Sequence, residues 1–364
     1  MKNIVFCADG TWNGTDVDKD EDGVPDFTNV LKLFHLLAGE TTLESRRLKD
    51  ESEKEMHEGA ALVQMAKYIH GVGDSSNPIK RLLGGTFGAG MIARIVRGYT
   101  FISRNYDAGD RIFVVGFSRG AYTVRALAGM ISSVGLLNKA QLDLADKELA
   151  YTMGASAWRQ YRDNARKAQA DRSLREKLAD MVSHLPGFAR VPLREGDLVP
   201  APVAGVGVWD TVGALGIPNI GESGKAVDAF RFTDDKLSAN VTMGLHAVSL
   251  HEQRSSFAPT LWQARDKITQ VWFAGAHSDV GGGYPARECG LSNIALHWMV
   301  QELEKHRVLF KPFPADWQMD EGAQMHEPWR EGVFAKLPSG PRDWTGYQLM
   351  EHPSVALRKE RLGG

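Results

Sequence analysis

Cysteine is scarce in this chain of 364 residues, which holds only Cys7 and Cys289. Neither belongs to a CxxC pair or to a Cys/His group with the spacing of zinc ligands. Two cysteines do not make a disulfide framework, so a small disulfide-stapled secreted domain is excluded. The cysteine usage fits a reducing compartment.

Long apolar runs are also missing. No stretch reaches the roughly 18 uninterrupted apolar residues that a membrane-spanning helix needs. Asp9 interrupts the N-terminal run MKNIVFCADG before it has the length of a signal peptide. We therefore expect a protein that is cytoplasmic where it is made, and export by a machine that needs no cleaved signal remains compatible with the sequence.

Neither sign of charge dominates, because 43 Lys and Arg face 45 Asp and Glu. Proteins whose main task is to neutralise nucleic-acid phosphates are normally strongly basic, so we expect no nucleic-acid partner. With 43% hydrophobic and 24% charged residues, the composition is that of an ordinary globular protein with a large core.

The chain does contain a series of short apolar runs that end in Gly or Asp. They predict buried strands over 3–8, 65–69, 111–116, 205–209 and 269–274. Helical patterns separate the runs, over 29–38, about 91–105 and 121–137. Strands alternating with helices predict an α/β fold with a mostly parallel central sheet flanked by helices.

The strongest local signal is the GxSxG pattern GFSRG at 116–120, which lies directly after one predicted strand and directly before a helix. In a nucleophile elbow the serine occupies a strained turn between strand and helix, and small residues let the two approach closely. Ser118 is therefore the candidate nucleophile. The alternative is a serine that only caps a helix.

A nucleophilic serine needs a base and an acid that orients the base, and in α/β-hydrolases these follow in the order Ser, Asp or Glu, His. Asp210 follows the predicted strand 205–209, and His277 follows 269–274. Both therefore lie at the carboxyl ends of strands, the edge where ligands bind in such sheets.

The transition state of acyl transfer also needs donors for its oxyanion. The backbone N–H of Arg119, the residue after the nucleophile, is one expected donor. The loop after the first strand, with Gly10 and Thr11, is expected to supply another. Gly10 suits a close approach of the backbone, and a simple turn is the alternative interpretation.

Seven motifs occur in collinear order: CADGTWNG (7–14), TNVLKL (28–33), GVGD (71–74), LLGGTFGAG (82–90), GFSRGAYTVRALAGMI (116–131), VWDTVGALG (208–216) and FAGAHSDVGGGY (273–284). Over residues 1 to about 300 this set resembles the class one lipase effectors of type VI secretion and the wider α/β-hydrolase family around them. The resemblance implies a phospholipase A-type esterase with Ser118 as nucleophile, Asp210 as acid and His277 as base. Asp279 also lies in a family motif; it is the alternative acid, or braces the loop of His277.

Two segments differ from the rest. Residues of about 139–200 are dense in charge and helical in pattern, which predicts a helical insertion that would cover the site as a lid or acyl-chain wall. Residues 311–364 are rich in Pro, Trp and charge and predict a C-terminal surface appendage. The catalytic α/β-hydrolase domain is then expected over 1–310.

An acidic stretch at 16–26 contains the pattern D-x-D-x-D-G-x-x-D, with Asp18, Asp20, Asp22 and Asp26. Alternating carboxylates with Gly at the sharp turn are typical of calcium loops, although Asn29 stands where an EF-hand has its last Glu. A structural Ca²⁺ is therefore one hypothesis and a solvated acidic loop is the other. No cofactor is expected for catalysis.

The leading hypothesis is a serine esterase that cleaves a lipid or small acyl ester through an acyl-enzyme, with transient contact to a membrane surface. Its partners would include a secretion apparatus or an immunity protein. A metal-dependent hydrolase using Asp9, Asp210, His277 and Asp279 explains the acids without the serine. A non-enzymatic binding module built on the acidic loop is the third hypothesis.

Overall fold

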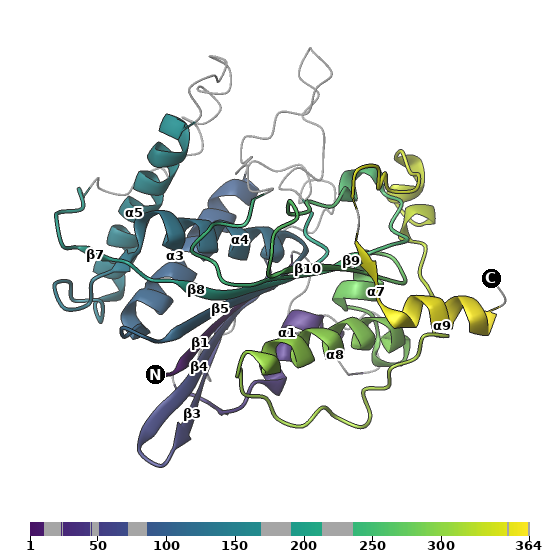
Figure 1. The fold of residues 1–364 in the computed structure, drawn as a ribbon, viewed down its shortest axis with the longest axis horizontal. Coiled ribbons are helices and arrows are strands. Elements are labelled where there is room, and N and C mark those ends of the chain that lie inside the picture. Colours follow the sequence, from purple (N-terminus) through teal and green to yellow (C-terminus); the bar gives the residue numbers. More distant parts are fainter. Residues whose placement is uncertain are drawn as a thin grey trace.

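The computed structural model describes residues 1–10, 23, 25–43, 45, 51–71, 86–168, 191–212, 236–347 and 349–362. Its centre is a sheet of nine strands in the order β11-β10-β9-β8-β5-β1-β4-β3-β2 (Figure 1). The pairs from β11 to β4 are parallel, whereas β3 pairs antiparallel with β4 and with β2. The predicted α/β fold with a mostly parallel sheet is confirmed.

The elements have the following bounds. The strands are β1 (Asn3–Ala8), β2 (Glu40–Thr41), β3 (Glu51–Glu58), β4 (Ala61–Ile69), β5 (Arg111–Phe117), β6 (Leu136–Leu137), β7 (Leu198–Val199), β8 (Val203–Trp209), β9 (Gly244–Ser249), β10 (Ile268–Phe273) and β11 (Met350–Glu351). The main helices are α1 (Asn29–Leu36), α3 (Thr86–Asn105), α4 (Ser118–Val134), α5 (Lys147–Ala168), α7 (His277–Gly281), α8 (Gly290–Lys305) and α9 (Pro353–Leu362).

Helices cover both faces of the sheet, with α3, α4 and α5 on one side and α1 and α8 on the other (Figure 1). Successive side chains of a strand point to opposite faces, so each face takes every second residue. In β1, Ile4 and Phe6 enter the core under α3 and α4, whereas Val5 and Cys7 enter the core under α1 and α8. Burial on both faces explains why this strand reads as an unbroken apolar run.

The predicted strands are all present, most of them within a residue or two of the expected bounds. Six further strands were not expected, β2, β3, β6, β7, β9 and β11, and the two longest of them are β3 and β9. β3 has the charged sequence ESEKEMHE and lies near the antiparallel edge of the sheet, where much of its surface is only half-buried. β9 is fully buried but short, and contains Gly244 and His246.

The predicted helical insertion begins and ends at a small two-stranded sheet, in which β6 pairs antiparallel with β7. Its helix α5 packs Gly154 against Val96 and Thr100 of α3. Arg104, near the end of α3, donates to the carbonyl of Leu144 just before α5. The two helices are therefore antiparallel, which directs the C-terminal end of α5 toward the carboxyl edge of the sheet. The role of the insertion as a lid stays a prediction.

The C-terminal segment, defined here as residues 311–362, crosses the surface beside β10 and adds β11 to the sheet edge (Figure 1). Two of its side chains, those of His326 and Arg342, reach the carboxyl edge of the sheet and bind residues there. The division into a domain of 1–310 and an appendage stays a prediction, but the appendage is part of the sheet and of the site.

None of the helices in these described ranges is long and apolar enough to cross a membrane.

Candidate active site

Ser118 occupies a strained turn between β5 and α4. Its φ of 57° lies in the left-handed region, which is costly for a residue with a side chain. The flanking glycines permit this turn: a Cβ on Gly116 would lie 2.5 Å from the carbonyl oxygen of Gly120, and one on Gly120 would lie 2.2 Å from that of Ala8. The sequence GFSRG therefore folds as the elbow that its position between strand and helix predicts.

His277 lies beside this elbow at the start of α7, and residues 274–276 separate it from the end of β10. Its ring centroid is 4.5 Å from that of Phe117, the residue before Ser118, and 4.9 Å from that of Phe257, which meets it edge-on. Nδ1 of His277 lies 2.6 Å from Oδ2 of Asp210. Donation from Nδ1 to this carboxylate leaves Nε2 with the lone pair that a general base needs.

Burial between the two phenyl rings lowers the pKa of His277, and the hydrogen bond to Asp210 opposes that shift. The imidazole is therefore neutral near pH 7 and able to accept a proton.

Asp210 is fully buried at the end of β8 and is itself held in the left-handed region, with a φ of 35°. Its two oxygens are shared among three neighbours. Oδ1 accepts from the backbone N–H of Ser249 at 2.9 Å and from Nη1 of Arg342 at 2.7 Å, while Oδ2 accepts from Nη2 of Arg342 at 2.8 Å and binds His277. Burial alone would raise the pKa of Asp210, but the Arg342 guanidinium and His277 hold it far below its usual range.

A second buried carboxylate supports the backbone of His277. Glu252 is fully buried and accepts from the N–H of His277 at 3.2 Å. Arg254 binds Glu252 through Nε at 2.9 Å and Nη2 at 2.8 Å, and lies 3.6 Å above the Phe257 ring. Sequence reasoning missed Glu252, Arg254 and Arg342, because none lies in a motif or at the end of a predicted strand.

The hydrogen bonds of Asp279 go to residues other than His277. Asp279 accepts from the backbone N–H of Ala276 at 2.8 Å and of His326 at 3.0 Å, and its Oδ1 lies 2.6 Å from Nδ1 of His326. It therefore braces the turn before α7, as the sequence also suggested, and joins that turn to the C-terminal segment.

The loop after β1 is organised around the buried Asp9. Its carboxylate accepts from the hydroxyls of Thr28 at 2.6 Å and Tyr68 at 2.8 Å, and from the N–H of Gly10 at 2.7 Å. Burial raises the pKa of Asp9 to about 6 in spite of these bonds. Because the Gly10 N–H is directed at Asp9 here, it must turn away to serve an oxyanion.

The other two predicted oxyanion residues are less defined. Arg119 begins the first turn of α4 directly after Ser118. Thr11 lies outside the described residues. The oxyanion site stays a prediction.

The predicted metal ligands divide into two groups. The metal-hydrolase hypothesis needs Asp9, Asp210, His277 and Asp279 around one ion. Asp210 and His277 are bonded to each other, but the described part of the chain holds no cluster of three His, Cys, Asp or Glu side chains suited to a metal ion. Of the calcium pattern, Asp26 is buried, whereas Asp18, Asp20 and Asp22 lie outside the described residues. The calcium loop therefore stays a prediction.

Comparison with known proteins finds three similar chains. The chain is 33% identical over 151 residues to the uncharacterized protein YEL023C of Saccharomyces cerevisiae, a match over 38% of this chain and 18% of that one. Among solved structures, an uncharacterized protein from Pseudomonas aeruginosa is 19% identical with a TM-score of 0.48, covering 88% of this chain and 49% of that one. A Tle1 effector bound to the VgrG spike of a type VI secretion system is 14% identical with a TM-score of 0.44, and the match covers 88% of this chain and 76% of that one.

The family comparison is more extensive. The sequence model described as the catalytic domain of the Tle1-like phospholipase effectors of the type VI secretion system matches residues 2–302. This range includes Ser118, Asp210 and His277 and confirms the resemblance that the seven motifs indicated. The chain therefore belongs to the family of Tle1-like phospholipase effector catalytic domains.

Proposed function

We propose that the protein is a serine esterase of phospholipase A type, with Ser118 as nucleophile, His277 as general base and Asp210 as the acid that orients it. The observation that carries the proposal is the 2.6 Å bond from His277 to Asp210, made in a buried site beside the strained turn of Ser118. Family membership supports a lipid ester as the substrate.

Each side chain has a defined part in this mechanism. Nε2 of His277 takes the hydroxyl proton of Ser118 while Oγ attacks the acyl carbonyl, and the resulting imidazolium is stabilised by Asp210. The imidazolium then protonates the departing alcohol, which for a glycerophospholipid is the lysophospholipid. Water, activated by His277 in the same way, hydrolyses the acyl-enzyme and regenerates Ser118.

Family membership also supports expectations about the substrate, the route of delivery and the partners. We propose a phospholipid at a membrane surface as the substrate, and delivery through a type VI secretion apparatus without a cleaved signal. A spike protein, as in the Tle1 complex, and an immunity protein are the partners that such delivery implies.

The decisive experiment compares the purified protein with Ser118→Ala on phospholipids, lysophospholipids and a short chromogenic ester. Loss of the nucleophile should lower kcat by about 10⁵-fold or more, since triad residues act as a unit. Ser133→Ala, an exposed serine on the same helix, is the matched control and should retain full activity. Turnover by Ser118→Ala close to that of the parent would refute the serine mechanism.

A fluorophosphonate probe separates the proposed function from its rivals. Covalent labelling should occur in the parent and in Ser133→Ala and be absent in Ser118→Ala. Activity that a chelator abolishes, in a protein that the probe does not label, would instead favour metal-dependent hydrolysis. A protein with neither activity nor labelling would favour a binding module.

A further inference from the structure

The C-terminal segment contributes a side chain to the centre of the site, although the family match ends at residue 302. We propose that Arg342 is a positioning residue of the catalytic centre, which fixes the orientation of the Asp210 carboxylate and thereby sets how strongly His277 holds its proton. This inference rests on the proposed serine mechanism and adds to it a component from outside the matched domain.

Arg342 forms a buried bidentate ion pair with Asp210. Its two terminal nitrogens bind the two oxygens of Asp210 at 2.7 and 2.8 Å, and each also donates to a backbone carbonyl, that of Ser249 at 2.8 Å and that of Phe257 at 2.6 Å. The Arg342 side chain is only 4% exposed. The two carbonyls hold the guanidinium plane independently of the carboxylate, so the plane of the carboxylate follows that of the arginine.

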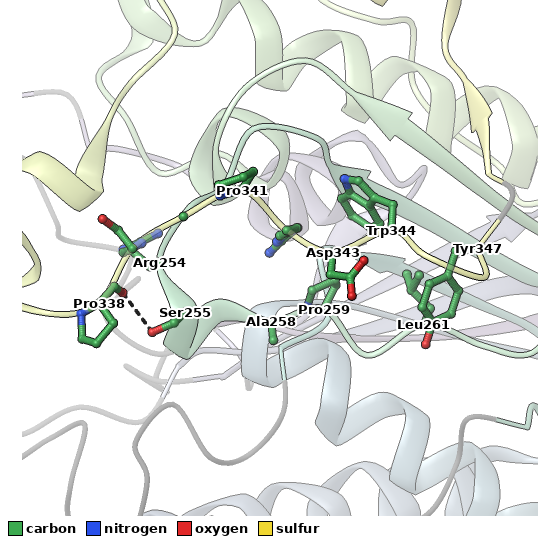
Figure 2. A pocket seen from close by; sticks show the side chains of 13 residues that line it. Arg254, Ser255, Ala258, Pro259, Leu261, Pro338, Pro341, Asp343, Trp344 and Tyr347 are labelled. Atoms are coloured by element: carbon green, nitrogen blue, oxygen red, sulfur yellow. Dashed lines mark hydrogen bonds between the residues drawn. The ribbon is translucent and has the colours of Figure 1, made fainter.

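The backbone on both sides of Arg342 is anchored. Ahead of it, Gly340 donates to the carbonyl of Gln253 at 2.8 Å, and the hydroxyl of Ser255 donates to that of Pro338 at 2.9 Å. After it, the Trp344 ring lies 5.2 Å from that of Trp272 in β10. Figure 2 shows Pro338, Pro341, Asp343 and Trp344 beside Ser255, Ala258 and Pro259. These residues and Arg342 line a cavity of about 470 Å³.

The charges facing this centre come from several elements. His277 is faced by Asp210, by Glu252 and by Arg254. Asp210 is faced by His277 and Arg342, and also by the buried His246, whose pKa is lowered to about 3 by burial and by Arg125. His246 is therefore neutral, which leaves Arg342 as the permanent cation bound directly to Asp210 among the described residues.

A cation at this place has a predictable effect on proton binding. The active form has neutral His277 and ionised Asp210, and activity is lost when that pair gains a proton. The charge of Arg342 disfavours that additional proton, so its removal must make the pair bind the proton more tightly. The acid limb of the pH profile then moves to higher pH. A residue with a purely structural role would lower activity without moving this limb.

The test measures kcat/KM of a short acyl ester between pH 5 and 9 for the parent, Arg342→Gln, Arg342→Lys and the control Arg330→Gln. Arg330 is an exposed cation of the same C-terminal segment. We expect Arg342→Gln to lose between about 10-fold and 10³-fold, less than loss of the acid itself. The midpoint of the acid limb of its pH profile should move to higher pH by about one unit or more, as expected for a charge a few ångströms from Asp210 and His277.

Arg342→Lys keeps the charge but not the bidentate geometry, so its acid limb should stay near that of the parent while kcat falls. A further variant, Arg342→Ala, leaves space for a free guanidinium ion; millimolar guanidinium should restore part of its activity and none of that of Ser118→Ala. Thermal melting and fluorophosphonate labelling report whether each variant is folded. If Arg342→Gln does not fold, the pH profile of Arg342→Lys and the rescue by guanidinium test the proposal instead.

Activity and acid limb of Arg342→Gln equal to those of the parent would overturn the proposal. So would a loss of activity with an unmoved limb and no rescue by guanidinium. Failure of the underlying serine mechanism is separately visible, because the parent would then carry no label on Ser118.

Discussion

Two aspartate–histidine pairs lie at the carboxyl edge of this sheet with the same bond length. His277 binds Asp210 and His326 binds Asp279, each through Nδ1 at 2.6 Å. The pKa values of the two histidines nevertheless shift in opposite directions. That of His277 is lowered, whereas that of His326 is raised.

The difference lies in burial and in the third member of each group. His277 is fully enclosed, and the carboxylate it binds is shared with the cation of Arg342. The side chain of His326 is 13% exposed. Burial still lowers its pKa, but Asp279 and a second carboxylate, Glu288 at 3.1 Å from Nε2, outweigh that effect. One arrangement favours the neutral histidine that the proposed proton transfer needs, and the other favours the charged form of a histidine that links two segments.

The largest expected effect separates the two aspartates. Asp210→Asn should lower kcat by about 10³ to 10⁴-fold, because the amide no longer selects the tautomer of His277 or stabilises its charged form. Asp279→Asn should lower kcat less than about tenfold, since its partner is not in the reaction. The measurement is kcat on a short ester, with melting temperatures as the folding control. A greater loss in Asp279→Asn would make Asp279 the catalytic acid.

A smaller effect concerns stability at the second pair. A histidine whose pKa is raised on folding stabilises the protein below its unfolded pKa of about 6.5, and this contribution disappears as the pH rises through the folded value. His326→Gln should therefore cost about 1–2 kcal/mol of unfolding free energy at pH 5.5 and less at pH 9. Urea unfolding at the two pH values measures it. An equal cost at both pH values would show that His326 acts through packing on Tyr284, whose ring centroid lies 3.7 Å from that of His326.

The smallest effect isolates the third partner. Glu288→Gln removes one of the two carboxylates on His326, so the pKa of His326 should fall toward its ordinary value while Asp279 still supports it. Because the Glu288 side chain is 28% exposed, the cost in stability should be about 0.5 kcal/mol or less. Titration of the imidazole by NMR gives the pKa, and Glu302→Gln on α8 is the control. An unchanged pKa would contradict the role assigned to Glu288.

The strands of the sheet centre were predictable because their environment is uniform. β1 and β5 are buried on both faces, so their sequences contain an uninterrupted apolar signal. β3 had no such signal, because its charged residues are satisfied by tertiary contacts. Lys54 in β3, for example, donates to three carbonyls at the end of α1, those of Phe34, His35 and Leu37.

The candidate site divides in the same way. Ser118, Asp210 and His277 each follow a predicted strand, and parallel strands bring their carboxyl ends to one edge, so order along the chain was enough to group them. Arg342 is 132 residues from Asp210 and lies in irregular backbone. Its place depends on how residues 338–340 run beside 253–255, which has no periodicity that a sequence pattern could reveal.

The sequence by itself determined the succession of β1, α1, β4, α3, β5, α4, β8 and β10, the elbow at Ser118 and the family. These depend on local patterns of apolar and small residues, which one chain segment contains in full. The sequence favoured Asp210 as the partner of His277 and left Asp279 as the alternative. Tertiary structure decided between the two, and it alone brings an arginine of the C-terminal segment to Asp210. Such partners are set by where separate loops cross one another, and the pKa of the histidine in the same Asp–His contact is lowered or raised according to its burial and to the third side chain beside it.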